Sequence, residues 1–383
     1  MVLADGVAGY VRFRAVCGAW RRCADPPRAH GGLDSRFHPR RWIMLPAVFA
    51  ADVDRRDFLN VSTGERIRAD LPELRGQLVI GHTSGGLLVL LCRNGTGDMR
   101  LLNPLTRQLT ALPNAAPLLN SQDKLEVLSA GLAYSSTVAL HLDDREMELA
   151  VAKPGDERWS YRARPKPASY WETDSDSIFS ALSFAHRFYC VTRNGVKAVD
   201  AAVTAGRQPQ LVVVVEEGRG VHENYLVDND GELIRVRTMP GLKMPRYEAH
   251  RVDVDAGRMV LVDDLRGRAV FVRNGGRSVS VRAGLSPSVK ANTVYRCTCN
   301  DDNRPTIGAY HLKKGWKTFD MRVRRGSTID YLSRYVCRSK DAVVPAPLSR
   351  CRGAWAAAEA AARDPRKRKR KANSMVIGDD WVN

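Results

Sequence analysis

The sequence predicts an all-β protein, namely an irregular β-propeller of antiparallel blades. Two observations carry this prediction. From residue 41 to residue 341 the chain consists of short runs of apolar and β-branched residues that are separated by turn residues. No amphipathic helical pattern of about ten residues interrupts these runs, which argues against alternating strands and helices. A short helical segment precedes this region, and a helical or disordered basic tail follows it.

A propeller is expected because so many short strands exceed what one sandwich of two sheets comfortably holds. Radial repetition of blades leaves only short sheet edges open to solvent. The chain shows no regular repeat with a Trp-Asp or double-glycine signature, so any blades have diverged in sequence. A double sandwich therefore stays open as the alternative architecture.

The composition is that of an ordinary globular protein. Of the 383 residues, 44% are hydrophobic and 27% charged, which excludes wholesale disorder. The longest apolar runs, such as 85–92 and 211–215, fall far short of the roughly 20 residues that span a bilayer. Asp5, Arg12 and Arg14 interrupt the start of the chain, so no secretory signal is visible. We expect a nuclear or cytoplasmic protein whose eight cysteines are reduced.

The net charge of +18 is concentrated at the two ends of the chain. Residues 1–41 hold eight arginines against three aspartates, a net charge of +5. Residues 363–371 hold seven lysines and arginines against one aspartate, a net charge of +6. The remaining +7 is spread over the long central region, so the charge alone does not require a phosphate-binding face there.

The first 24 residues contain a helical pattern. Its apolar positions recur with the spacing i, i+3, i+7 and i+10, which places them on one helical stripe, and they are Tyr10, Phe13, Cys17 and Trp20. Gly18 weakens the middle, so one helix and two short helices are both compatible with the pattern. Residues 25–40 are rich in Pro, Gly, Asp and Ser and are expected to form a linker.

The central region, 41–341, contains the expected strands. In chain order they are 78–92, 99–112, 128–142, 147–153, 188–192, 211–216, 224–228, 232–237, 249–255, 258–262, 269–273, 278–282, 292–297 and 306–312. Three of the connections, at 227–232, 255–257 and 273–276, have Asn, Asp or Gly where a tight hairpin needs left-handed backbone. These turns predict antiparallel pairing of the strands that flank them.

Residues 342–383 are expected to form an Ala-rich helix over 354–362 and then a disordered basic tail. The tail contains six consecutive cations, which repel one another and stay solvated: Arg366, Lys367, Arg368, Lys369, Arg370 and Lys371. Such a run suits capture by the acidic groove of a nuclear import receptor, or contact with phosphates. A plain solvated tail is the alternative, and no aromatic residues interleave the run for base stacking.

Neutralising all six of these cations is expected to shift a fluorescently tagged protein out of the nucleus, because the import receptor then loses its charge contacts. Microscopy of tagged wild-type and neutralised chains measures this. An unaltered distribution would remove the import role from the tail.

Two parts of the sequence resemble a known family. Residues 10–21, with the pattern Tyr-x-Arg-Phe-Arg-Ala-Val-Cys-x-x-Trp, resemble the second half of a plant F-box module. The body resembles the KIB-type β-propeller domain that follows F-boxes in a large plant family. The phrases that carry this resemblance are 71–76 (LPELRG), 101–106 (LLNPLT), 112–113, 153–159, 187–192, 225–228, 251–253, 264–271 and 292–295.

The resemblance implies a substrate-recognition component of a cullin-RING ubiquitin ligase. The N-terminal residues Tyr10, Phe13, Cys17 and Trp20 would contact a Skp-type adaptor, and the propeller would bind a protein target. Ubiquitin chemistry would take place on other subunits, so this chain would not be an enzyme and would need no cofactor.

Three departures from the family pattern leave alternatives open. Only nine residues precede Tyr10, so the first F-box helix with its Leu-Pro pair is missing and adaptor docking is weakened. Gly86 stands where the family usually has Trp, and the basic tail is not part of the pattern. The helical stripe could instead be a small internal core. The chain could also be a nuclear, basic-tailed scaffold or nucleic-acid-associated protein that does not recruit the ligase.

Motifs for catalysis or metal binding are absent from the sequence. Residues 81–85 lack the Gly-x-Ser-x-Gly spacing of a nucleophile elbow. Residues 228–231 resemble the start of a calcium loop, but Met239 occupies the position of the required glutamate, so a hairpin is expected. Cys297 and Cys299 form a single close pair, whereas a structural zinc site usually needs two pairs. We therefore predict no catalytic, metal-binding or cofactor-binding residues.

Overall fold

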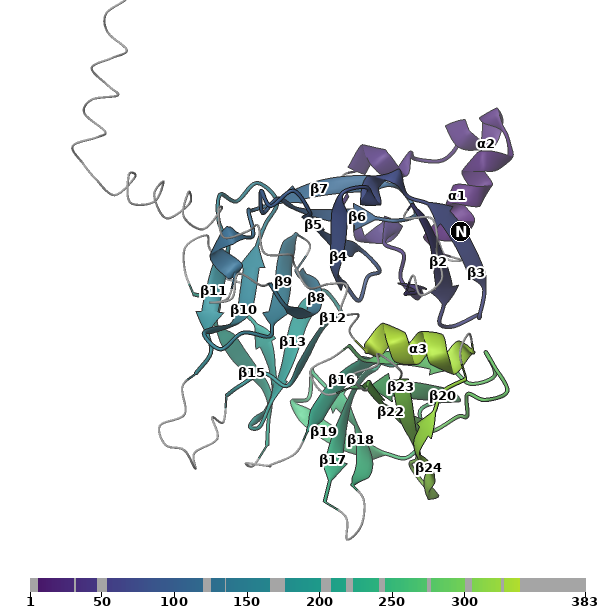
Figure 1. The fold of residues 1–383 in the computed structure, drawn as a ribbon, viewed down its shortest axis with the longest axis vertical. Helices are drawn as coiled ribbons and strands as arrows, with labels where there is room; N and C mark the ends of the chain where they lie inside the picture. Colours follow the sequence, from purple (N-terminus) through teal and green to yellow (C-terminus); the bar gives the residue numbers. More distant parts are fainter. Residues whose placement is uncertain are drawn as a thin grey trace, which may run out of the picture.

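In the computed structural model, the described part of the chain forms six sheets arranged around a central axis (Figure 1). The predicted β-propeller is confirmed, with six blades in chain order. The described residues are 6–30, 32–46, 54–119, 125–134, 136–165, 176–200, 208–217, 223–240, 245–273, 277–299, 305–324 and 327–337.

Blade 1 has three antiparallel strands, β1 (Trp42–Met44), β2 (Arg55–Asn60) and β3 (Arg66–Asp70). Blades 2 to 5 each have four antiparallel strands, in chain order across the sheet. Blade 2 comprises β4 (Gln77–His82), β5 (Leu88–Cys92), β6 (Met99–Asn103) and β7 (Gln108–Leu112). Blade 3 comprises β8 (Val127–Ala133), β9 (Thr137–Leu142), β10 (Met147–Ala152) and β11 (Ser160–Ala163).

Blade 4 comprises β12 (Ser180–Phe184), β13 (Arg187–Thr192), β14 (Gly195–Val199) and β15 (Leu211–Glu216). Blade 5 comprises β16 (Asn224–Asp228), β17 (Leu233–Met239), β18 (Arg246–Asp253) and β19 (Arg258–Val262). Blade 6 comprises β20 (Arg268–Val272), β21 (Val279–Arg282), β22 (Thr293–Cys299), β23 (Pro305–His311) and β24 (Gly315–Arg322). Contacts of β4 with β8, of β8 with β12, of β12 with β16 and of β16 with β21 make these the innermost strands.

Burial follows the position of each strand in its blade. In β9 and β10 every residue is buried, because each blade packs its two faces against the neighbouring blades. In β3, an outer strand of blade 1, exposed and half-buried residues alternate. The predicted hairpin between β16 and β17 is confirmed, with left-handed backbone at Asp230 (φ 61°) and Gly231 (φ 95°).

Blade 6 departs from the expected antiparallel pattern. Its strand order is β21-β20-β22-β23-β24, and β22 runs parallel to β20. The hairpin from β20 returns β21 to the innermost position, so the chain must cross back to add β22 on the other side of β20. The ring closes where Arg282 N–H of β21 donates to the Val61 carbonyl after β2, at 3.0 Å.

Helix α3 (Thr328–Val336) follows blade 6 and was not predicted. Its buried side chains Ile329, Leu332 and Val336 join one apolar cluster with residues of blades 1 and 6, so α3 seals the junction between the first and last blades. Figure 1 shows α3 lying beside blade 6, on the side toward blade 1. The helix begins after Ser327, which caps it: the Ser327 hydroxyl accepts from Asp330 N–H, at 3.1 Å.

The N-terminal region contains α1 (Val7–Val16) and α2 (Gly18–Arg22), so the helical pattern forms two helices that are separated at Cys17. The stretch expected as a linker contains two 3-10 helices, Pro27–His30 and Ser35–Phe37. Phe37 is buried, and its carbonyl accepts from the Asn103 amide at 2.8 Å, which ties this stretch to blade 2.

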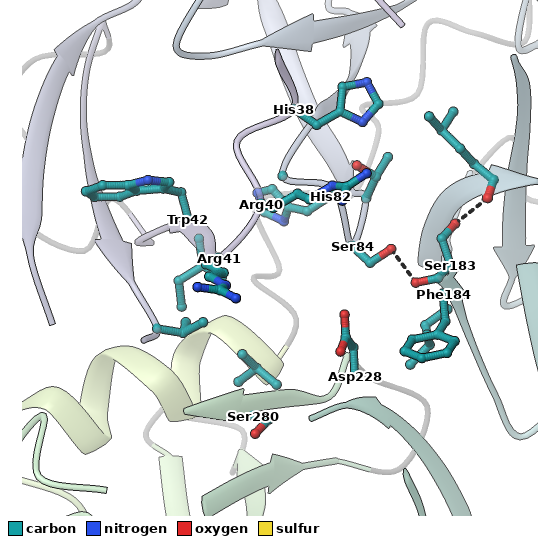
Figure 2. Close-up of a pocket in the computed structure, with 18 of the residues that line it drawn as sticks. His38, Arg40, Arg41, Trp42, His82, Ser84, Ser183, Phe184, Asp228 and Ser280 are labelled. Atoms are coloured by element: carbon teal, nitrogen blue, oxygen red, sulfur yellow. Dashed lines mark hydrogen bonds between the residues drawn. The ribbon is translucent and has the colours of Figure 1, made fainter. Parts of the chain in front are cut away.

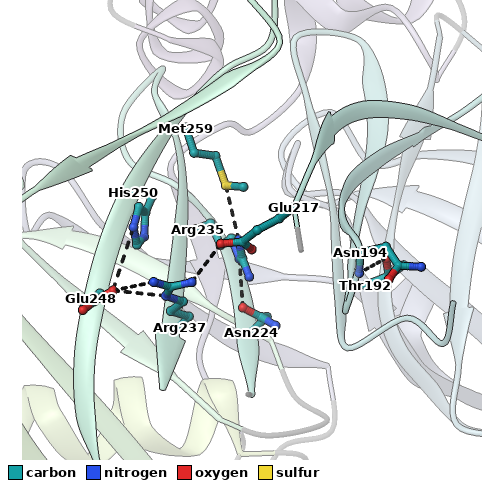
Figure 3. Close-up of polar contacts among 9 residues, drawn as sticks. All are labelled: Thr192, Asn194, Glu217, Asn224, Arg235, Arg237, Glu248, His250 and Met259. Atoms are coloured by element: carbon teal, nitrogen blue, oxygen red, sulfur yellow. Dashed lines mark hydrogen bonds and ion pairs between the residues drawn. The ribbon is translucent and has the colours of Figure 1, made fainter. Parts of the chain in front are cut away.

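A network of charged side chains joins blades 4 and 5 (Figure 3). Glu217 follows β15, and its carboxylate pairs with Arg235 and with Arg237 of β17, the latter at 2.8 Å. Arg235 is only 3% exposed and also donates to the Asn224 amide oxygen at 2.8 Å. Arg237 bonds in turn to Glu248 of β18, at 2.9 Å. The network satisfies a buried guanidinium at the blade interface.

The predicted C-terminal tail is not part of the described structure. The Ala-rich segment and the cation run Arg366–Lys371 lie outside the described residues, so their structure and role stay predictions. Among the helices of the described ranges, none combines the length and the apolar character that crossing a membrane requires.

Candidate functional site

The described residues line an open cavity of about 490 Å³ at one end of the central channel (Figure 2). It lies where the innermost strands β4, β8, β12 and β16 end and turn outward, and we call it the channel mouth. Thr83, after β4, forms a parallel bridge to Ala130 of β8, which shows that neighbouring inner strands run the same way. Residues 35–44, β20, β21 and α3 also contribute to its wall.

Left-handed backbone is concentrated at this mouth. Eight non-glycine residues of the described chain have positive φ, and five of them line the cavity: Arg41, Tyr134, Ala185, His186 and Asp230. Such conformations cost free energy and tend to be retained at binding or catalytic sites. The turns are held by hydrogen bonds, including one from Tyr134 N–H to the His186 carbonyl at 2.6 Å.

The glycine that departs from the family pattern also lines the mouth. Gly86 has φ 82°, and a Cβ atom added to it would lie 2.4 Å from the Pro39 carbonyl oxygen. A larger residue would collide with this backbone and would be strained as well. The close approach of residues 38–40 therefore requires glycine at this position in this chain.

The side chains of the mouth leave one cation without an acid partner. Arg41 and Arg268 both pair with Asp230, at 3.0 and 3.4 Å. Arg40 also lines the cavity, and no carboxylate within the described ranges forms an ion pair with its guanidinium. Asp228 accepts from Gly231 N–H at 2.9 Å, and burial raises the pKa of its carboxyl group. Arg40 and Asp228 are thus free to engage a ligand.

Two histidines of the mouth are neutral and incompletely bonded. His38 is 6% exposed; burial, with a smaller effect of the nearby Arg40, lowers its pKa to about 4. One ring nitrogen bonds to the backbone of Leu33, and the other, Nε2, has no partner. His82 has no hydrogen-bond partner at either ring nitrogen, and burial followed by the charge of Arg277 lowers its pKa. Neither imidazole carries a charge near pH 7.

Hydroxyl groups connect three blades at the ends of their innermost strands. The Ser84 hydroxyl of blade 2 donates to the Ser183 carbonyl of blade 4 at 2.8 Å, as Figure 2 shows. The Ser183 hydroxyl donates to the Leu132 carbonyl of blade 3 at 2.6 Å. These bonds fix the mouth in one shape. Over the described ranges, no cluster of three or more His, Cys, Asp or Glu side chains could hold a metal ion.

The four residues of the predicted adaptor-binding stripe do not share one environment. Tyr10 is buried against Phe37, with ring centroids 5.5 Å apart, and its hydroxyl donates to the Asp25 carbonyl at 2.8 Å. Phe13 and Trp20 stack on each other at 4.6 Å, joining α1 to α2. Cys17 is exposed at the break between the helices. Tyr10 therefore anchors the helices to the propeller.

Three apolar side chains of these helices are exposed to solvent, among exposed arginines. Val16 is 62% exposed and Trp20 is 45% exposed, and Val11 is 36% exposed. We call these three residues the helical face. The helical spacing that singled out Trp20 did not include the two valines, because they lie off its stripe.

The family of the chain follows from a comparison with family models. A family model described as the KIB1-4 beta-propeller matches residues 58–320. No curated protein matches the chain. Solved structures of low similarity include the Cps50 (Swd1) β-propeller domain of Myceliophteria thermophila, at 14% identity and TM-score 0.31, covering 71% of this chain and 82% of that one.

Two further solved structures are similarly distant. YCF48 from Cyanidioschyzon merolae is 11% identical with a TM-score of 0.30, covering 68% of this chain and 75% of that one. The Malassezia sympodialis allergen Mala s 1 is 9% identical with a TM-score of 0.30, covering 67% of this chain and 80% of that one. Likenesses of this size carry no argument about function.

Proposed function

The chain belongs to the KIB1-4 β-propeller family, a family of interaction modules, and on that premise we propose that it is the substrate-recognition component of a cullin-RING ubiquitin ligase. The propeller would bind a protein target, and helices α1 and α2 would contact a Skp-type adaptor. Ubiquitin transfer would be carried out by other subunits, so this chain would act as a receptor.

The observation that supports adaptor contact is the helical face. Val7 and Tyr10 attach α1 to the propeller through Phe37, so the orientation of the helices is set by packing. Val16 and Trp20 then face solvent, where a partner can reach them. A helix that presents apolar anchors to a groove is a common mode of peptide and protein recognition.

Replacing Trp20 with alanine and Val16 with serine together is expected to weaken adaptor binding by about tenfold to a hundredfold, because aromatic anchors dominate such interfaces. Copurification with a Skp-type adaptor, followed by a titration of the affinity, measures this. Leu261→Ser on β19 is the matched control, since Leu261 is 63% exposed on blade 5, away from the helices. Absence of adaptor enrichment with the wild-type chain would reject the ligase role.

We also propose a nuclear location, on the strength of the cation run 366–371. It is independent of the ligase role, because a propeller that binds its target without an adaptor could be imported by the same signal. The six-residue neutralisation described above tests it.

A further inference from the structure

We propose that the channel mouth binds an acidic segment of a protein, with a carboxylate on Arg40 and backbone N–H groups on His38 and Asp228. This inference extends the proposed function, because the segment would belong to the target. It does not depend on adaptor recruitment.

The first argument is charge. Arg41 and Arg268 are neutralised by the shared Asp230, whereas Arg40 has no acid partner among the described residues. Arg40 is exposed at the wall of the cavity, where its guanidinium can bind a carboxylate with two parallel hydrogen bonds. An anionic group on the ligand is the complement of this unpaired cation.

The second argument is the pair of acceptors beside that cation. His38 bonds to the Leu33 backbone through one nitrogen, and such a bond to a carbonyl leaves Nε2 as an acceptor that needs a donor. His38 is only 6% exposed, so leaving its Nε2 acceptor without a hydrogen bond costs free energy. Asp228 is a second acceptor that faces the cavity (Figure 2).

A ligand for this site therefore needs an anion and one or more N–H donors close together. Sulfate or the carboxylate of a fatty acid lacks the donors, whereas a peptide with an acidic side chain has both. His82, with one donor and one acceptor nitrogen when neutral, complements the amide groups of a peptide as well.

The third argument is the shape of the mouth. Its volume of about 490 Å³ lies in the range of ligand pockets and holds a few side chains. Trp42, Phe184 and Leu182 add apolar wall beside the polar groups, and this wall suits a hydrophobic neighbour of the acidic residue. The hydrogen bonds that join blades 2, 3 and 4 keep the site in one conformation before a ligand binds. This preorganisation lowers the entropic cost of binding.

The test uses the full chain and two fluorescein-labelled probes, acetyl-Gly-Glu-Phe-Gly-amide and the same peptide with Gln in place of Glu. Fluorescence anisotropy is expected to show the Glu probe binding about tenfold more tightly than the Gln probe. Arg40→Gln is expected to remove this preference, and Arg40→Lys to retain part of it. Arg258→Gln on β19, another exposed arginine, is the matched control.

Three results would overturn the inference: equal binding of the two probes, an unchanged preference in Arg40→Gln, or no saturable binding up to about 1 mM. N-acetylglutamate tests whether a small carboxylate is sufficient. If it competes with an affinity equal to that of the Glu peptide, the site binds a small carboxylate instead of a protein segment. Thermal unfolding checks that Arg40→Gln is folded. Copurification of this variant with the adaptor keeps the two proposals apart, because loss of one interaction leaves the other measurable.

Discussion

Replacing Glu217 with alanine is expected to lower the free energy of unfolding by about 3–5 kcal/mol, because it leaves a buried arginine without its carboxylate. Arg235 is 3% exposed and retains only the Asn224 amide and a contact to the Met259 sulfur (Figure 3). Arg237 would keep its second partner, Glu248, so the loss falls mainly on Arg235. Urea unfolding of wild type and variant measures the difference.

A double variant, Glu217→Leu with Arg235→Met, is the control for this prediction. It removes both charges and restores apolar volume, so we expect it to recover most of the lost stability. Glu248→Gln should lower the free energy of unfolding less than Glu217→Ala does, because Arg237 is more exposed than Arg235 and keeps its ion pair with Glu217. A loss below about 1 kcal/mol in Glu217→Ala would show that water or a rearranged side chain compensates the buried charge.

Acidification is expected to destabilise the protein through its buried histidines, His82 among them. Burial lowers the pKa of His141 to about 3 and that of His38 to about 4, with smaller contributions from Arg164 and Arg40 respectively. In the unfolded chain both titrate near 6.5. Between pH 6.5 and the folded pKa only the unfolded state binds the proton, so stability falls as pH falls and levels off below the folded pKa.

At pH 4.5 the free energy of unfolding is lowered by about 2–3 kcal/mol for each of His141 and His38. His141→Leu removes one of these protons, so its stability should fall less steeply than that of wild type between pH 6.5 and 4.5. Comparing the two chains by urea unfolding cancels the contribution of carboxylates, which titrate in both. The same slope in both chains would show that His141 is protonated in the folded state.

Local chemistry explains which parts of the fold could be predicted. The strands 211–216, 224–228 and 258–262 have the predicted bounds, because β-branched runs and the turn residues beside them act within a few positions. The hairpin at Asp230 and Gly231 is of the same kind. Helix α3 was missed although its nine residues carry the signals of a short helix, with Ser327 as the N-cap and the apolar residues Ile329, Leu332 and Val336 at helical spacing.

The channel mouth could not be predicted, because its residues come from distant parts of the chain. His38 and His82 are isolated in sequence, and no motif singles them out. Their importance arises because segments between residues 35 and 335 meet at one end of the ring. Helical spacing similarly placed Tyr10 on the same stripe as Trp20, but packing against Phe37 turns Tyr10 inward.

The sequence by itself determined the class of the protein: strand propensity, hairpin turns and the succession of family phrases act locally or in order along the chain. Only the tertiary structure decided the number of blades, the closure by α3 and the composition of the mouth. The physical reason is that closing the ring and burying a charge depend on contacts between segments far apart in the chain. Local sequence patterns do not show which distant segments will meet.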